Sequence, residues 1–363
     1  MNSLSDRHGG NIFGLSREMR EHLLDFSANI NPLGLSPKGK EALEAHWEEA
    51  VLRYPDADQR ALKEALSRHY HMDENMISLG NGATELMYAL MDTLAPGVVY
   101  VPAPSFSEYA YSARHSGARV IPFYLDPDRD FAFDGRRLAR EMLPKSVVFL
   151  GHPNNPDGRL LSKEALLTLL HRAAEKEAHV VVDESFIDFI EGGPSFREDV
   201  KQHEALVVLM SLTKFYAVPG LRIGCAFSSP ALAEKMNSRM VPWHVNGLAQ
   251  LYMTAALEDI QYQQTSRTFC REERACLAEE LAHIRGLSIF PGTVNFILCH
   301  LTGGMTGREL QEKLLLEGIL IRRCQNYDGL DDSFIRVAVR TRPENERLII
   351  ALKKALVNTK ETT

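Results

Sequence analysis

Short apolar runs rich in β-branched residues alternate with amphipathic stretches through the middle of the chain. The apolar runs, each expected to be a strand, lie at residues 98–102, 119–125, 146–152, 179–185 and 206–211. Helical patterns at 105–117 and 162–178 separate some of them. Continuous apolar strands joined by helices predict an α/β fold whose mostly parallel sheet is covered on both faces. The run 222–228 follows its predecessor too closely for a crossover helix, so we expect it to be antiparallel.

The pattern changes after residue 246. A long helical segment runs through the 250s to the 280s, and two further helical patterns cover 307–318 and 344–356. Short strands are expected at 287–290, 294–300, 320–323 and 334–340. This mixture predicts a smaller α+β domain. We therefore expect a large domain at 46–246 and a small domain at 247–363, with residues 1–45 packed against the small domain.

Composition narrows the class of protein. The 363 residues are 45% hydrophobic and 25% charged, with a formal net charge of -7. This small net negative charge disfavours binding to nucleic acids and membrane surfaces, because such binding needs concentrated Lys and Arg. The polar start predicts no secretory signal peptide, and no apolar run reaches the ~20 residues of a membrane helix. The five cysteines form no CxxC pair, so we expect free thiols in a cytoplasmic protein and no metal site.

Four polar segments coincide with the ends of predicted strands or open a helix. They are Gly80–Glu85, His152–Gly158, Asp183–Ser185 and Ser211–Phe215. Each alone has an ordinary structural explanation, such as a turn, a helix cap or a solvated lysine. Ligands of open parallel sheets bind beyond the carboxyl ends of the strands. The four segments together therefore predict one binding site.

Pyridoxal phosphate is a cofactor that needs all four segments at once. Its aldehyde is held as an imine by a lysine amine, for which Lys214 is the candidate. Its pyridine nitrogen needs a carboxylate such as Asp183, and its phenolic oxygen needs a neutral donor such as Asn155. Phe106, which follows the run 98–102, is placed to stack on the ring.

The phosphate of the cofactor needs a separate set of groups. A helix N-terminus with free N–H groups is expected at Gly82 and Ala83. Ser211 precedes Lys214 by three residues, and Arg222 follows it by eight. Both side chains can reach the same phosphate.

The motif S-x-T-K-x-x-x-x-P-G-L-R-x-G at 211–224 resembles that of fold-type I pyridoxal-phosphate enzymes. The chain is similar to histidinol-phosphate aminotransferases, and more similar to the threonine-phosphate decarboxylases of cobalamin biosynthesis. The segments that carry the second resemblance are HGGN (8–11), DFSANINPLG (25–34), RYPDAD (53–58), GNGATE (80–85), DESFIDFI (183–190), the lysine motif and FIRVAVR (334–340). The resemblance implies a large domain with a mostly parallel seven-stranded sheet and a smaller α+β domain.

The resemblance also implies roles for individual residues. Lys214, Asp183 and Asn155 take the cofactor roles given above, and Tyr54 reaches the cofactor phosphate of a second subunit, which implies a homodimer with shared active sites. Arg336 binds the substrate carboxylate. The other residues that the resemblance places around the substrate are His8, Gly9, Asn29, Asn155 and Arg322. The chain departs from the family pattern at Arg323 and His244, which leaves fine substrate preference open.

The implied activity is decarboxylation of an amino-acid O-phosphate. The expected substrate is L-threonine O-3-phosphate, which gives (R)-1-amino-2-propanol O-2-phosphate. L-serine O-phosphate, which gives ethanolamine phosphate, differs by one methyl group, and the sequence does not separate the two. A histidinol-phosphate-type aminotransferase is the main alternative, because the same cofactor residues serve both reactions. A pyridoxal-phosphate regulator is disfavoured, since such proteins carry a DNA-binding domain ahead of this fold.

Overall fold

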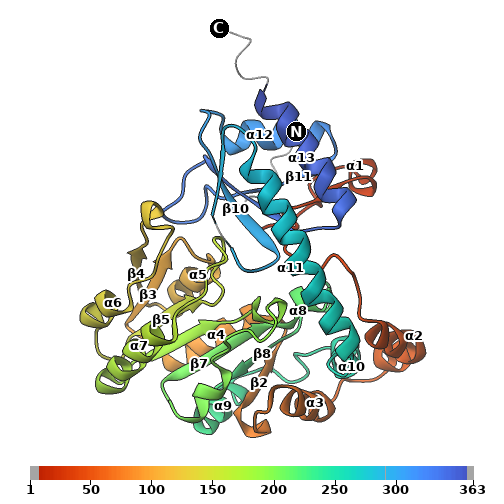
Figure 1. The fold of residues 1–363 in the computed structure, drawn as a ribbon. Coiled ribbons are helices and arrows are strands. Elements are labelled where there is room, and N and C mark those ends of the chain that lie inside the picture. The colour runs from red at the N-terminus through yellow and green to blue at the C-terminus, as the bar shows by residue number, and fades with distance from the viewer. Residues whose placement is uncertain (1–7, 291, 358–363) are drawn as a thin grey trace.

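Seven strands form the central sheet of the computed structural model, which describes residues 8–290 and 292–357 (Figure 1). Their spatial order is β2-β8-β7-β6-β5-β3-β4. The strands are β2 (Ile77–Gly80), β3 (Val98–Ala103), β4 (Arg119–Tyr124), β5 (Val147–Gly151), β6 (His179–Asp183), β7 (Leu206–Ser211) and β8 (Gly224–Phe227). Only β8 pairs antiparallel with its neighbours, β2 and β7. The predicted strands and the antiparallel entry of the run 222–228 are confirmed.

Helices cover both faces of this sheet, which explains the continuous apolar strands. Val180 and Val182 of β6 pack in one core cluster, and Val181 between them packs in another on the opposite face. Alternate residues of a strand point to opposite faces, so both sets must be apolar. The covering helices are α3 (Arg60–Tyr70), α4 (Ala83–Leu94), α5 (Glu108–His115), α6 (Gly135–Glu141), α7 (Lys163–Lys176) and α9 (Pro230–Asn237).

A second unit holds the end of the described chain, drawn in blue in Figure 1. Its four-stranded sheet has the order β12-β13-β10-β9. The strands are β9 (Leu287–Ile289), β10 (Phe296–Leu301), β12 (Arg322–Arg323) and β13 (Phe334–Ala338), and the helices are α12 (Gly307–Leu316) and α13 (Arg342–Val357). A reciprocal capping box between Thr306 and Glu309 begins α12. This unit therefore has the mixed α+β structure that the sequence predicts for it.

The N-terminal segment touches both units. It contains α1 (Arg17–Glu21), β1 (Leu24–Asp25) and α2 (Pro37–Leu52). β1 pairs in parallel with β11 (Ile319–Leu320) of the second unit, whereas α2 packs against α10 (Gly247–Ala256). Residues 1–7 of the predicted segment 1–45 lie outside the described residues, as do 291 and 358–363 of the predicted domain 247–363.

The domain division at 246/247 stays a prediction, and we propose a later boundary. α10 and the first part of α11 (Ile260–Ala282) contribute Tyr252, Tyr262 and Cys270 to the core of the large sheet. Leu277 and Leu281, further along α11, belong to the core of the second unit. A boundary within α11, between Cys270 and Leu277, separates the two cores better than residue 246. Within the described residues, no helix is long and apolar enough to cross a bilayer.

Candidate active site

A cavity of about 820 Å³ lies over the carboxyl ends of β5, β6 and β7 and is closed from the other side by the second unit. It brings together twelve predicted residues: His8, Gly9, Asn29, Ala83, Phe106, Asn155, Asp183, Ser211, Lys214, Arg222, Arg322 and Arg336. Gly82 is the N-cap residue directly before Ala83. Tyr54 is not brought to the cavity. Its side chain is 81% exposed, and its ring lies 4.9 Å from that of Trp243.

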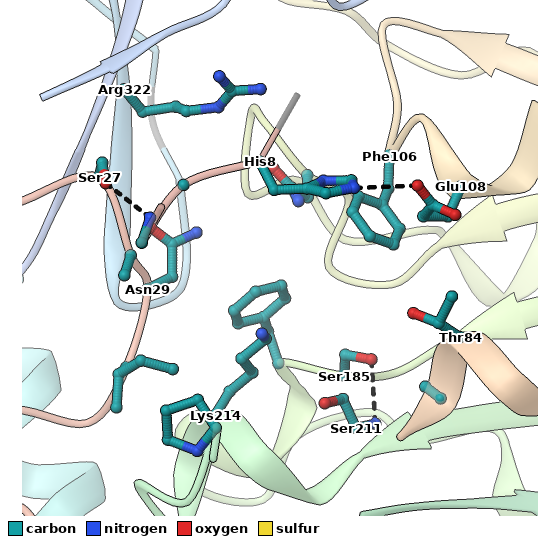
Figure 2. A pocket seen from close by; sticks show the side chains of 18 of the residues that line it. His8, Ser27, Asn29, Thr84, Phe106, Glu108, Ser185, Ser211, Lys214 and Arg322 are labelled. Atoms are coloured by element: carbon teal, nitrogen blue, oxygen red, sulfur yellow. Dashed lines mark hydrogen bonds and ion pairs between the residues drawn. The ribbon is translucent and has the colours of Figure 1, made fainter. Parts of the chain in front are cut away.

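Lys214 projects into the cavity from the short helix α8 (Leu212–Phe215), which directly follows β7 (Figure 2). Its backbone carbonyl accepts a hydrogen bond from the Asn31 amide at 3.0 Å, which anchors the N-terminal segment beside it. Burial, together with the guanidinium groups of Arg222 and Arg336, lowers the pKa of Lys214 to about 8, and Asp183 opposes the shift. A lysine with a lowered pKa is partly neutral near physiological pH, as a carbonyl-binding amine must be.

Asp183 ends β6 and is buried. Its Oδ2 accepts a hydrogen bond from the Tyr109 hydroxyl at 2.8 Å, and its Oδ1 accepts one from the Ser185 amide at 2.9 Å. Burial raises the pKa of Asp183, and these hydrogen bonds oppose the increase. The Tyr109 ring is in turn stacked on Phe149, with 5.0 Å between centroids. The carboxylate is therefore held in one orientation at the floor of the cavity.

An anion-sized recess lies at the N-terminus of α4. Gly82 has φ 88°, supplies no capping side chain, and faces the Arg222 guanidinium so closely that a Cβ atom would collide with it. A left-handed residue without a side chain therefore leaves backbone N–H groups and a cation around one small space. The Ser211 hydroxyl borders the same cavity and shares a hydrogen bond of 2.8 Å with Thr213. This recess suits the phosphate of the predicted cofactor.

Asn155 joins the two sides of the cavity. Its Oδ1 accepts hydrogen bonds from the Tyr327 hydroxyl at 3.0 Å and from Arg336 Nη1. With the oxygen engaged by two donors, the amide nitrogen is the group left to donate into the cavity. That orientation fits the predicted contact with a phenolic oxygen. The residues present thus fit pyridoxal phosphate at its aldehyde, pyridine nitrogen, phenolic oxygen and phosphate. We call Asn155, Asp183, Ser211, Lys214 and Arg222 the sheet wall.

The opposite side is formed by His8, Arg322 and Arg336, which we call the cationic wall. The two arginines are paired across β12 and β13 and are 4% exposed each. Arg336 Nη2 donates to the Ser27 carbonyl at 3.1 Å, and Arg322 Nη2 donates to Asn326 at 2.7 Å. Two buried guanidinium groups beside an open cavity are suited to an anionic ligand.

The two departures from the family pattern lie outside the cavity lining. Arg323 points to the other face of β12 and pairs with Asp332 at 3.1 Å. The two ring nitrogens of His244 lie 2.7 Å from the Val241 carbonyl and 3.0 Å from the Leu79 carbonyl. His244 therefore ties its loop to the end of β2. Both side chains act on local structure in this chain.

Several polar residues of the cavity received no individual role from the sequence. They include Ser27, Glu108, Tyr109 and Tyr327, as well as Thr84 and Ser185, which lie within the segments singled out there. The position of Ser185 two residues after Asp183 is a usable signal, because such a spacing is typical of a side chain that caps its own turn. Tyr109 and Tyr327 offer no comparable local signal.

Residues 21–352 match the family described as aminotransferase class I and II, and the chain belongs to that family. It is 37% identical to the threonine-phosphate decarboxylase of Salmonella typhimurium over 96% of each chain. The L-threonine-O-3-phosphate decarboxylase structure from Porphyromonas gingivalis has a TM-score of 0.81 and 27% identity, covering 92% of this chain and 99% of its own. The histidinol-phosphate aminotransferase structure from Clostridium acetobutylicum has a TM-score of 0.84 and 33% identity, covering 93% and 100%. The fold class predicted from the sequence is confirmed.

Proposed function

We propose that the chain is a pyridoxal-phosphate-dependent decarboxylase of an amino-acid O-phosphate. The substrate is L-threonine O-3-phosphate, and the product is (R)-1-amino-2-propanol O-2-phosphate for cobalamin biosynthesis. The observation that carries the proposal is the cationic wall facing Lys214 and Asp183 across one cavity. The 37% identity to a threonine-phosphate decarboxylase over nearly the full length supports the same substrate.

The sheet wall holds the cofactor. Lys214 binds its aldehyde, Asp183 keeps a proton on its pyridine nitrogen, and Asn155 donates to its phenolic oxygen. Its phosphate lies in the recess formed by Gly82, Ala83, Ser211 and Arg222, and Phe106 packs against the ring. When bound, pyridoxal phosphate withdraws electrons from the bonds of the substrate Cα.

The cationic wall holds the substrate. Arg336 binds the carboxylate, and His8 and Arg322 bind the phosphate, with Gly9 and Asn29 bordering the same space. Reaction choice depends on which bond of the substrate Cα these contacts would orient for cleavage. For decarboxylation that would be the bond to the carboxylate held by Arg336, and the Lys214 amine would then be the group that delivers a proton to Cα.

A histidinol-phosphate-type aminotransferase is the second candidate. It is favoured by the TM-score of 0.84 to such an enzyme. The two candidates differ in their need for a keto acid, since only a transaminase must regenerate its cofactor with one.

Carbon dioxide release tests the proposal. The purified holoenzyme is incubated with O-phospho-L-threonine or O-phospho-L-serine, without a keto acid. Continuous release from phosphothreonine supports the proposal, and its rate relative to phosphoserine measures the preference. A single methyl group changes such a ratio by roughly 10–200-fold. Absence of carbon dioxide with both compounds refutes the decarboxylase.

The proposed assembly is a cytoplasmic homodimer with shared active sites. Large apolar side chains close in sequence to Tyr54 and Trp243 are exposed, namely Trp47, Val51, Leu52 and Val241, and the Tyr54 and Trp243 rings lie 4.9 Å apart. We take these side chains as the candidate subunit interface. All five cysteines are free, as expected in a reducing compartment.

Subunit mixing tests the shared site. We expect Tyr54→Ala and Lys214→Ala to be weak or inactive alone and to regain part of the activity when mixed, because each heterodimer then has one intact site. No recovery after confirmed subunit exchange contradicts sharing, provided that Tyr54→Ala alone is impaired.

A further inference from the structure

A carboxylate lies among the groups proposed to bind a doubly anionic substrate. Glu108, the first residue of α5, lines the cavity and is 5% exposed. A buried carboxylate repels a phosphate unless a cation or donors offset its charge. Its presence in this cavity therefore calls for a role that its contacts explain.

Glu108 binds two side chains from other elements. Its Oε1 accepts a hydrogen bond from His8 Nε2 at 3.0 Å, and its Oε2 accepts one from the Tyr88 hydroxyl of α4 at 3.2 Å. Figure 2 shows the His8 ring and the Glu108 carboxylate facing each other beside Phe106. The His8 and Phe106 ring centroids are 5.8 Å apart.

The backbone next to His8 is held at a second point. The Gly10 amide donates to Ser27 Oγ at 2.8 Å, and Gly9 lies so close to the Ser27 carbonyl that a side chain would collide with it. Residues 8–10 therefore span from Ser27, near Arg336, to Glu108 on α5. Without Glu108, the side chain of His8 loses the contact that fixes it at the far end of this span.

The contact also fixes one proton position on His8. A carboxylate only accepts hydrogen bonds, so His8 Nε2 carries a proton in this contact. Nδ1 makes no hydrogen bond within the described residues and is the nitrogen left to meet a ligand. A histidine ring with one nitrogen fixed by protein and the other without a protein partner among the described residues is suited to share a hydrogen bond with a phosphate group.

We propose that Glu108 is a positioning residue for the substrate phosphate, acting through His8. It orients the ring and accepts the hydrogen bond of Nε2, which leaves Nδ1 for the ligand. The proposal rests on the proposed function for the identity of the substrate, and it adds a residue to which that function gives no role.

The test is a double-mutant cycle on the holoenzyme with O-phospho-L-threonine. In Glu108→Gln we expect KM to rise about tenfold with kcat changed less than about twofold, as for one charge-assisted hydrogen bond used in binding. His8→Ala should raise KM at least as much. The double variant should be no worse than His8→Ala, because Glu108 acts only through that ring. Tyr88→Phe removes the hydrogen bond from the Tyr88 hydroxyl to Glu108 Oε2, keeps the carboxylate, and should change KM less than about twofold.

Three outcomes overturn the proposal. They are an unchanged KM in Glu108→Gln, a double variant whose effect is the product of the single effects, and a loss confined to kcat. If Glu108→Gln does not bind cofactor, Glu108→Asp replaces it, since the shorter side chain withdraws from His8 and should raise KM in the same way. If the wild type releases no carbon dioxide, the proposed decarboxylase function is wrong, but the role of Glu108 in binding is still open to test. The same cycle is then measured as the Kd for phosphothreonine by spectral titration of the cofactor.

Discussion

The two walls of the cavity are built in different ways. Residues of the sheet wall lie along one edge of the large sheet, where Asp183 is held both by its sequence neighbour Ser185 and by the more distant Tyr109. The cationic wall is assembled from distant segments. His8 is fixed by Glu108, 100 residues away, and Arg336 by Ser27, 309 residues away. The sheet wall therefore comes from one edge of one sheet, whereas the cationic wall combines the N-terminal segment with the second unit, and the contact between Asn155 and Arg336 joins the two walls.

The sheet wall should give the largest effect when its lysine is removed. In Lys214→Ala we expect activity to fall by at least about a thousandfold, because the amine both binds the cofactor and moves a proton. The visible absorption of the bound cofactor should be lost. Borohydride reduction of the wild type followed by peptide mapping should label Lys214, and a label on another lysine contradicts the assignment.

Asp183→Asn should lower kcat by about a hundredfold or more while the protein still binds cofactor. An amide does not stabilise a protonated pyridine as a carboxylate does. Tyr109→Phe is the matched control, since it removes one hydrogen bond of 2.8 Å and keeps the charge. Steady-state kinetics and cofactor content check both variants. A near-normal kcat in Asp183→Asn contradicts the role given to Asp183 in holding the protonated pyridine.

Substitutions in the cationic wall should raise KM for the substrate. Arg322→Gln should raise KM for phosphothreonine about tenfold or more, because one guanidinium that binds phosphate is lost. Arg323→Gln is a stringent control, since the neighbouring side chain points away and pairs with Asp332. It should alter thermal stability but leave KM within about twofold. Equal KM effects in the two variants contradict the proposal that Arg322 binds the substrate phosphate whereas Arg323 only pairs with Asp332.

The smallest expected effect concerns stability behind the sheet wall. His152, fully buried, has Nε2 within 2.8 Å of the Pro194 carbonyl, and its Nδ1 accepts from the Leu161 amide. Burial lowers the pKa of His152 from 6.5 to about 4. Between these values the unfolded chain binds the extra proton, so this residue makes the free energy of unfolding fall as pH decreases through that window.

His152→Gln should remove this contribution, which amounts to at most about 3 kcal/mol across the window. Burial raises the pKa of Glu184 to about 7, which acts in the opposite direction. The comparison of variant with wild type, by urea unfolding at several pH values, therefore isolates His152. Parallel pH profiles for the two proteins contradict the assignment.

Sequence reasoning reached the residues of the site more fully than the contacts that hold them. The strands, the antiparallel β8 and the cofactor candidates follow from periodicity and from polar residues at strand ends, which are local signals. Tyr109 pairs with Asp183 across 74 residues, and Tyr327 pairs with Asn155 across 172. No local pattern encodes such pairs. The sequence predicts a boundary at 246/247, and the apolar pattern of α10 does not reveal that its Tyr252 joins the core of the large sheet.

The central claim is that the enzyme decarboxylates a phosphoamino acid in this cavity and that its cofactor returns to the starting form after each turnover. The most direct measurement incubates the holoenzyme with phosphothreonine in heavy water without a keto acid. It counts the carbon dioxide released per active site and determines the mass of the product by mass spectrometry. We predict many turnovers, with aminopropanol phosphate carrying one solvent deuteron on the former Cα and the cofactor absorption unchanged. A single turnover that bleaches this absorption, and resumes only when 2-oxoglutarate is added, contradicts the claim and identifies an aminotransferase.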